Sequence, residues 1–177
     1  NQLRHIENPV AAEIYTSDSV MMGKYYLQNR MDLNIDEVTP EILDALIATE
    51  DIRFYEHNGI DVKSLGRVAV KSLMLQRNTG GGSTITQQLA KNLYPRKQFL
   101  LGSIVINKLR EMVIAVKLEN IYSKDEILQL YLNTVPFGED TYGIKSGALR
   151  YFHKNPTQLK TEEIAMLVGM LKGTSLY

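Results

Sequence analysis

Signals for the start of a helix recur along the sequence from residue 36 onward. Thr39-Pro40 combines a capping residue with a proline at the first helical position, and the apolar residues at 42, 43, 46 and 47 then share one helix face. The pattern predicts a mainly α-helical domain. Further helix starts are predicted at Asp61, Thr84, Ser123, Asn155-Pro156 and Thr161.

Residues 1–33 differ from the rest of the chain. The segment "AAEIYTSDSVMMGKYYLQN" alternates loosely, is rich in tyrosine and has Ser17-Asp18-Ser19 in its middle, which favours a β-hairpin or two short strands. We therefore expect a β appendage or linker over 1–33 and the main domain over 34–177. Because neither Asn1 nor Tyr177 resembles a natural chain end, we expect a piece of a longer protein.

Composition excludes several classes of function. Twenty basic and twenty acidic residues cancel, so no net field attracts a polyanion and a nucleic-acid partner is disfavoured. The absence of cysteine excludes disulfides, thiolate catalysis and cysteine-ligated zinc, and the three histidines show no metal-ligand spacing. No run of about 20 apolar residues is present, so we expect no segment that spans a bilayer.

The stretch "TGGGSTITQQLAKNLY" joins three glycines, residues 80–82, to a row of hydroxyl and amide side chains. The glycines permit unusual backbone angles and the close approach of a ligand. Ser83, Thr84 and the first free amides of the following helix can form an anion site, and Lys91 can reach inward from two turns further on. A flexible linker before a capped helix is the alternative, but the density of polar side chains favours function.

A carboxylate pair, Glu50-Asp51, ends a predicted apolar helix just before a loop that contains Phe54 and His57. A carboxylate at the rim of a core, beside an aromatic ring, can have a raised pKa and act as an acid or base. The same residues suit a solvated helix end with a salt bridge to Arg53. On this motif alone, the solvated helix end is the favoured interpretation.

Lys108 and Glu111 are three positions apart in "NKLREMVIAVKLE" and therefore share a helix face. The surrounding apolar residues predict a well-buried helix, on which a glutamate needs a partner, whereas an ordinary surface ion pair is the alternative. Upstream, Arg96-Lys97 precedes an apolar run that ends at residue 106. This run suits either the core or a surface that dips into a membrane, and the sequence favours neither.

Together these blocks resemble the peptidoglycan glycosyltransferase domain, glycosyltransferase family 51, of class A penicillin-binding proteins and monofunctional transglycosylases. The first family motif is similar to "EDIRFYEHNG", and the second is matched fully by "GGSTITQQ". The third is similar to "NKLRE", the fourth to "KDEILQLYLN", and the segment before the last motif to "LVGMLKGTSLY". The motifs occur in the family's order between residues 35 and 177.

The resemblance implies a lysozyme-like helical fold with a head lobe and a membrane-touching jaw lobe. It implies polymerisation of lipid II into β-1,4 glycan strands, with inversion at C1 and release of undecaprenyl pyrophosphate. The implied partners are lipid II, the nascent glycan strand, the membrane surface beside the apolar run, the inhibitor moenomycin and a transpeptidase domain in the same full-length chain. The implied location is the outer face of the bacterial cytoplasmic membrane, with an N-terminal anchoring helix outside this sequence.

The resemblance also implies the roles of individual residues. Glu50 would be the general base, and Glu111 would lie near the donor, where it orients basic groups or a divalent cation such as Mg²⁺ or Mn²⁺. Arg53 would shape the cleft. The residues implied in substrate binding are Asp51, Phe54, His57, Gly82, Ser83, Thr84, Thr86, Gln87, Gln88, Lys91, Asn92, Arg96, Lys108, Tyr131 and Asn133, of which Asn133 also suits a helix C-cap.

Two departures from the family pattern lie in the basic region. Asn107 stands where the third motif has arginine, and the segment between Tyr94 and Lys108 is a few residues longer than usual. Two alternative functions stay open at this point. One is a glycan hydrolase of lysozyme-like fold, in which water replaces the acceptor sugar, and the other is a non-catalytic module that binds lipid II.

Overall fold

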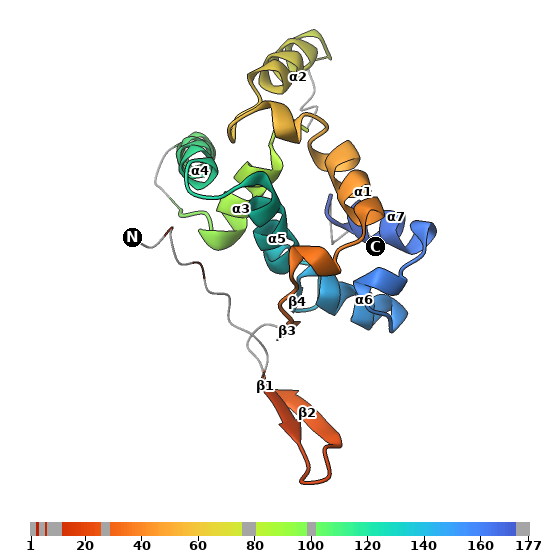
Figure 1. Ribbon diagram of the computed structural model, residues 1–177. Coiled ribbons are helices and arrows are strands. Elements are labelled where there is room, and N and C mark those ends of the chain that lie inside the picture. Colours follow the sequence, from red (N-terminus) through yellow and green to blue (C-terminus); the bar gives the residue numbers. More distant parts are fainter. Residues whose placement is uncertain are drawn as a thin grey trace. The chain divides into compact units, whose positions relative to one another are not determined.

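The chain is mainly α-helical, as the capping signals predict, in a computed structural model that describes residues 3, 6, 12–25, 29–75, 81–98 and 102–172. Contacts divide the chain into two compact units. The first unit is Asn1–Arg4 with Leu46–Tyr131, and the second is His5–Ala45 with Leu132–Tyr177. The α-helices of the described ranges are α1 Pro40–Glu50, α2 Val62–Leu75, α3 Ile85–Leu93, α4 Ser103–Glu119, α5 Lys124–Thr134, α6 Ile144–Phe152 and α7 Thr161–Met170 (Figure 1).

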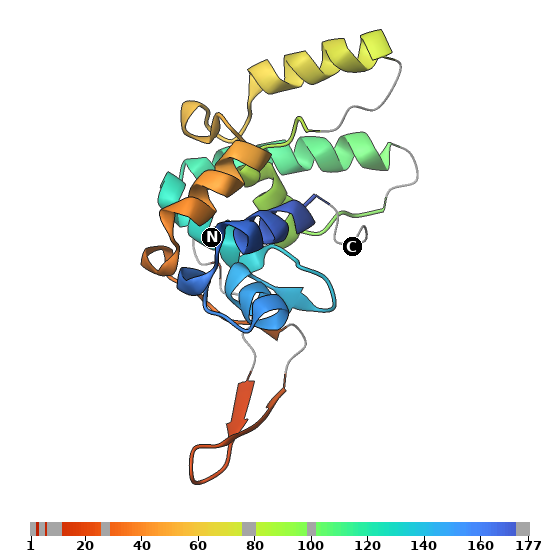
Figure 2. The ribbon, with the colours of Figure 1, turned by 90° about the vertical axis from the view of Figure 1, so that its right-hand side faces the viewer.

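The expected N-terminal hairpin is present. Strand β1, Ala12–Tyr15, pairs antiparallel with β2, Met21–Tyr25 (Figure 2). The turn lies at Ser17-Asp18-Ser19, where the Thr16 amide donates to the Val20 carbonyl at 2.8 Å. The mainly α fold class with an N-terminal hairpin is therefore confirmed, and the domain boundary between residues 33 and 34 stays a prediction.

The first unit is built from α2, α3, α4 and the adjoining parts of α1 and α5, with α3 packed against α4 (Figure 1). The predicted caps form at its helix starts: Asp61 accepts from the Ser64 amide at 3.0 Å, and Thr84 accepts from the Gln87 amide at 3.1 Å. The side chains of its core are Leu46, Phe54, Ile85, Leu89, Ala90, Ala115, Leu118, Ile127, Leu128 and Tyr131.

Gly59 brings the loop after the short 3-10 helix η2, Phe54–Glu56, directly onto α4. Its φ is +87°, and a Cβ at this position would lie 2.8 Å from the carbonyl carbon of Ala115. A non-glycine residue would meet both backbone strain and a steric clash here. The close approach places the loop that follows Glu50 against the helix that carries Glu111.

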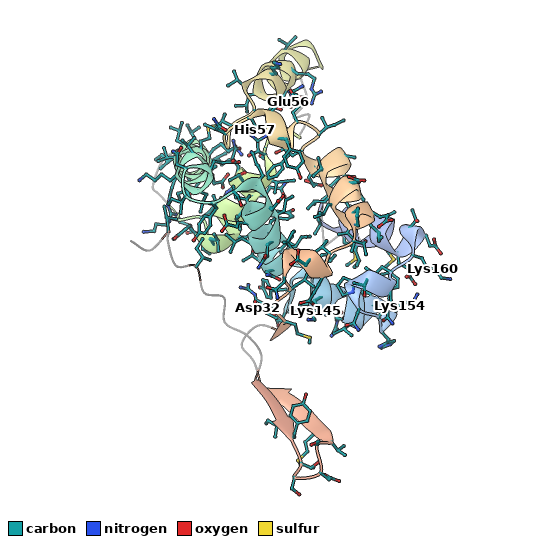
Figure 3. All side chains as sticks on the ribbon, in the orientation of Figure 1. Asp32, Glu56, His57, Lys145, Lys154 and Lys160 are labelled. Atoms are coloured by element: carbon teal, nitrogen blue, oxygen red, sulfur yellow. The ribbon has the colours of Figure 1, made fainter. Side chains whose placement is uncertain are left out.

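The second unit contains α6 and α7, which lie side by side (Figures 1 and 2), and strand β3, Asn29–Arg30, parallel to β4, Thr141–Tyr142. Lys145 donates from Nζ to the Asp32 carbonyl at 3.4 Å and to a Glu37 carboxylate oxygen at 3.1 Å (Figure 3). Its core consists of Leu33, Val38, Ile42, Leu132, Val135, Phe137, Ile144, Ala148, Ile164, Leu167, Val168 and Met170.

Two predicted helix starts in the second unit are wrong in detail. Asn155-Pro156 opens only the 3-10 turn η3, Pro156–Gln158, which closes after three residues because the Leu159 amide donates back to Pro156. The following helix is capped by Lys160, and Thr161 is already its first residue. Glu163 explains this boundary, since its carboxylate accepts from the Lys160 amide at 2.8 Å.

Candidate functional site

Glu50 ends α1 with its carboxylate held at one oxygen. Its Oε2 accepts a 2.7 Å hydrogen bond from Nε2 of Gln88 on α3, and Oε1 of Gln88 accepts from the Tyr131 hydroxyl at 3.1 Å. Burial, assisted by the charge of Glu50, raises the pKa of Tyr131, which therefore stays a protonated donor. Within the described part of the chain, the other oxygen of Glu50, Oε1, is buried and accepts no hydrogen bond.

Glu50 opens on a pocket of about 150 Å³ that lies wholly within the first unit. Residues 81–84 form one wall. The C-terminal end of α1, the residues just after it and the beginning of α2 form the rest. Its lining residues are Ala48, Thr49, Glu50, Asp51, Ile52, Asp61, Ser64, Arg67, Gly81, Gly82, Ser83 and Thr84. The structure thus brings Glu50 together with Gly82, Ser83 and Thr84, as the motifs predict, while Gly80 lies outside the described residues.

Asp51 ties the loop after α1 to the start of α3. Its Oδ2 accepts from the Ile85 amide at 3.1 Å, and Nε2 of His57 lies 3.0 Å away from the same oxygen. Nδ1 of His57 accepts from the Gly59 amide at 3.2 Å (Figure 3). The ring proton therefore sits on Nε2, which donates it to Asp51. These contacts give Asp51 and His57 a supporting role beside Glu50.

The polar side chains at the start of α3 hold the helix in place. The Thr84 hydroxyl and Nε2 of Gln87 both donate to the Gly59 carbonyl, at 2.7 and 3.2 Å, and Thr86 donates to Glu119 at 2.6 Å. Thr84 caps the helix as predicted, whereas the Gln87 side chain reaches the Gly59 carbonyl instead of its own helix start. Their implied contacts with substrate stay a prediction.

A second cluster surrounds Glu111, which is only 5% exposed on α4. Nε of Arg96 donates to its Oε1 at 2.8 Å, and Nζ of Lys108 lies 3.5 Å from its Oε2 and donates to the Ser83 hydroxyl at 2.7 Å. Burial lowers the pKa of Lys108 and the charge of Glu111 opposes that shift, whereas the hydrogen bond to Glu111 raises the pKa of Arg96. Ser83 thus connects the pocket of Glu50 to this cationic cluster.

The surface-pair alternative for Lys108 and Glu111 is wrong, because Glu111 is buried and has two cationic neighbours. The salt bridge expected between Arg53 and the Glu50-Asp51 pair is also absent from the described contacts. Arg53 donates instead to both oxygens of Asp61, at 2.8 and 2.7 Å. Arg53 therefore does not neutralise the charge of Glu50 in any described contact.

Three implied binding residues lie apart from these contacts. Lys91 is exposed on α3 and close enough for its charge to lower the pKa of Lys108, and Asn92 is half-buried on the same helix. Asn133 belongs to the second unit, where its side-chain amide accepts from the Leu33 amide at 3.0 Å and donates to the Leu33 carbonyl at 2.9 Å. These bonds join α5 to the segment before α1. Asn133 lies inside α5 and is therefore no C-cap, while its implied contact with substrate stays a prediction.

Sequence reasoning missed Lys124, which contacts three residues near the site: Phe54, His57 and Glu119. Its Nζ donates to the His57 carbonyl at 2.7 Å and to Glu119 at 2.9 Å, and it lies 4.3 Å from the centre of the Phe54 ring. Phe54 itself is fully buried. The available signal was the position of Lys124 at the head of the fourth motif, next to Ser123.

The donor set around Glu111 does not fit a divalent cation. Glu111 is bracketed by two positive side chains, Arg96 and Lys108, which would repel a metal ion. Among the described residues, no group of three or more histidine, cysteine or acidic side chains is arranged to hold a metal. The local chemistry is that of an anion site, into which a phosphate group fits better than a cation does.

The first half of α4 carries exposed apolar side chains. Ile104 is 77% exposed, and the exposed Val105, Leu109 and Val113 are spaced four residues apart, so that these three share one helix face. The apolar run predicted up to residue 106 is therefore not core where it is described, and residues 99–101 lie outside the described ranges. In the part of the chain that the structure describes, no helix has the length and apolar character needed to cross a membrane.

The arrangement can serve as a base beside an anion-binding cluster, and comparison with known proteins identifies the family of the chain. The family model described as Transglycosylase matches residues 18–177. Penicillin-binding protein 1F of Bacillus subtilis (strain 168) is 40% identical over 167 residues, which are 94% of this chain and 23% of that relative.

Penicillin-binding protein 1A of Escherichia coli (strain K12) is 36% identical over 175 residues, which are 99% of this chain and 20% of the relative. Penicillin-binding protein 1A of Neisseria flavescens is 39% identical over 177 residues, 100% of this chain and 22% of the relative. The chain spans about a fifth of the length of these curated relatives. With a family model that matches residues 18–177 and such relatives, the chain belongs to the transglycosylase family.

Proposed function

We propose that this chain is a peptidoglycan glycosyltransferase domain that polymerises lipid II. The observation that carries the proposal is the geometry of Glu50. One carboxylate oxygen is fixed by Gln88, the other accepts no hydrogen bond from any described residue, and Glu50 itself lines the pocket. Membership of the transglycosylase family supports the same reaction class.

In the proposed reaction, Oε1 of Glu50 takes the proton from the 4-hydroxyl of the acceptor sugar. The acceptor oxygen forms a bond to C1 of the lipid-linked donor, while the bond between C1 and the pyrophosphate oxygen breaks. Undecaprenyl pyrophosphate leaves with the bonding electrons. Because the base and the leaving group lie on opposite faces of the sugar, the configuration at C1 inverts to a β-1,4 link.

Lys108 and Arg96 would stabilise the negative charge that develops on the leaving pyrophosphate. Glu111 would hold these two cations in place through the contacts at 3.5 and 2.8 Å. Without a carboxylate between them, the two positive groups would repel each other and spread apart. In this proposal Glu111 orients the cations, and no step depends on a metal ion.

We further propose that the exposed face of α4 formed by Val105, Leu109 and Val113, together with the exposed Ile104, lies against the membrane surface. Apolar side chains on one face of an exposed helix suit the interface between headgroups and acyl chains. This contact would let the lipid tail of the substrate stay in the bilayer while its headgroup reaches Lys108. The names of the relatives support a further part of the proposal, that the domain works at the outer face of the cytoplasmic membrane.

The full-length protein is proposed to carry a transpeptidase domain as well. The relatives are named penicillin-binding proteins, and the chain covers about a fifth of their length. Lipid II and the growing glycan strand would be the substrates of the domain described here. Moenomycin would bind at the cationic cluster, because it resembles the lipid-linked donor.

Incubation of the protein with lipid II, followed by sizing of the products, tests this function. We expect glycan polymers and released undecaprenyl pyrophosphate. Shortening of pre-formed glycan, with no polymer from lipid II, would instead identify a hydrolase. Calorimetric binding of lipid II without any turnover would identify a binding module. Either of these results would overturn the proposal.

A further inference from the structure

Asn107 makes a set of hydrogen bonds that no motif predicts. It lies in the second turn of α4 and is 3% exposed. Its Oδ1 accepts from the Lys97 amide at 3.0 Å, while its Nδ2 donates to the Lys97 carbonyl and to the Ser103 carbonyl, each at 2.7 Å. One side chain therefore pairs with both backbone groups of Lys97, as a neighbouring strand would.

Few other described hydrogen bonds connect residues 95–98, the segment that Asn107 holds, to α4. Residues 95–98 form no helix or strand, and their side chains are exposed. The remaining described contacts to α4 are a bond from Arg110 to the Pro95 carbonyl at 3.2 Å and the pair of Arg96 with Glu111. An ion pair whose arginine is 46% exposed contributes little by itself to holding a loop.

Asn107 and Glu111 are one helical turn apart on the same face of α4. The Asn107 contacts fix Lys97, and Arg96 is the residue directly before it. Asparagine is a poorer helix former than alanine, so helix propensity does not explain a buried asparagine at this position. The hydrogen bonds to Lys97 explain it.

We infer that Asn107 is a positioning residue that holds Arg96 against Glu111 and so completes the pyrophosphate-binding cluster. The inference rests on the proposed function, since it names how one cation of that site is held. Arg96 engages Glu111 through Nε, which leaves the terminal nitrogens of the guanidinium able to face a phosphate oxygen. Position 107, where the family has arginine, thus contributes to the cluster indirectly. Asn107 holds Lys97 and, with it, the adjacent Arg96.

The test compares Asn107→Leu, Arg96→Ala and the double variant in the full-length protein. Leucine has the same number and branching of side-chain heavy atoms as asparagine and a higher helix propensity, so α4 should stay folded while the hydrogen bonds to Lys97 are lost. We expect polymerisation of lipid II to slow about tenfold in each single variant, because displaced groups lose stabilisation of the leaving group. The double variant should be no slower than Arg96→Ala, because both changes act through the same guanidinium.

Lys117→Ala, an exposed change on the same helix, is the control and should keep the wild-type rate. A wild-type rate in Asn107→Leu, or a double variant as slow as the product of the two single effects, would overturn the inference. If Asn107→Leu fails to fold, Asn107→Asp provides the same test, because it keeps the acceptor for the Lys97 amide and loses both donor bonds.

A measurement independent of activity separates this inference from the proposed function. In protein labelled with ¹⁵N-arginine, the Nε–H signal of Arg96, assigned by its loss in Arg96→Lys, should exchange slowly in the wild type and rapidly in Asn107→Leu. Equal exchange in the two proteins would refute the positioning role even if the wild type polymerises lipid II. Loss of polymerisation in the wild type itself would instead refute the proposed function.

Discussion

Nε2 of Gln88 lies 2.7 Å from Oε2 of Glu50, although the two residues are 38 positions apart. This bond joins the end of α1 to the middle of α3. It occupies one carboxylate oxygen of a residue that lines the pocket and leaves the other without a described hydrogen bond. The orientation of the proposed base therefore depends on a residue of the second motif.

Gln88→Leu is expected to slow polymerisation about tenfold to a hundredfold, because Glu50 loses the donor that orients it. Tyr131→Phe is the matched control, since it removes the more distant bond from the Tyr131 hydroxyl to Gln88 and keeps the bond from Gln88 to Glu50. Steady-state rates with lipid II should rank the wild type above Tyr131→Phe and Tyr131→Phe above Gln88→Leu. Equal rates for all three proteins would contradict the orienting role of Gln88.

Lys108 should impose an alkaline limit on the reaction. Burial lowers its pKa below the usual 10.5, so the ammonium group loses its proton at a lower pH than an exposed lysine does. Polymerisation should consequently decline as the pH rises through this lowered pKa. Lys108→Arg keeps its charge throughout this range and should move the decline to higher pH. An identical alkaline limb in the two rate profiles would exclude Lys108 as the titrating group.

Asp61 should stabilise the first unit in a pH-dependent way. Burial alone would raise its pKa, but hydrogen bonds from Arg53 and Ser64 outweigh burial and lower the pKa well below the usual 3.8. A depressed pKa stabilises the fold above pH 3.8, and this contribution disappears as the pH falls toward the folded-state pKa. We expect Asp61→Asn to reduce the free energy of unfolding by about 2 kcal/mol at pH 7, from the lost cap and charged hydrogen bonds.

Urea unfolding at pH 7 and below pH 3 checks the prediction for Asp61. The difference between the wild type and Asp61→Asn should shrink at the lower pH. Asp44→Asn, at an exposed position within α1, should change stability by less than about 0.5 kcal/mol at either pH. A difference for Asp61→Asn that grows on acidification would have the wrong sign and would contradict the assignment.

Gly59→Ala should destabilise the chain by about 2 kcal/mol or more, because the methyl group would clash with the Ala115 backbone and the φ of +87° is strained for alanine. Gly66→Ala offers a matched control within α2, where no atom lies within 4 Å of the added methyl group. That change should stabilise by about 0.5–1 kcal/mol through helix propensity. Thermal unfolding of both variants tests this prediction. A Gly59→Ala protein that is as stable as the wild type would contradict the close approach of its loop to α4.

The helix starts were predictable where a cap acts locally. Asp61, Thr84 and Ser123 each bond a backbone amide three residues ahead, and such short-range contacts are visible in sequence. The expectation for Thr161 was wrong because Glu163 caps a residue further upstream. Local signals thus predicted the fold class and most helix starts, whereas the helix expected at Asn155-Pro156 is only a 3-10 turn.

The candidate site was predictable as a set of motifs but not as a set of contacts. The motifs indicated Glu50, Gln88 and Glu111, yet the bond between Glu50 and Gln88 depends on how α1 and α3 pack. The roles of Lys124 and Asn107 were missed for the same reason. Their partners, the His57 and Lys97 backbones, carry no signal in their own side chains.

Glu50→Gln, assayed for polymerisation of lipid II, tests the central proposal most directly. The substitution removes the proton acceptor and keeps the size of the side chain, so the melting temperature should stay within a few degrees of the wild type. We expect the rate to fall by about a hundredfold or more, in line with the loss of a general base. A well-folded Glu50→Gln protein that makes glycan polymer at the wild-type rate would contradict the proposed role of Glu50.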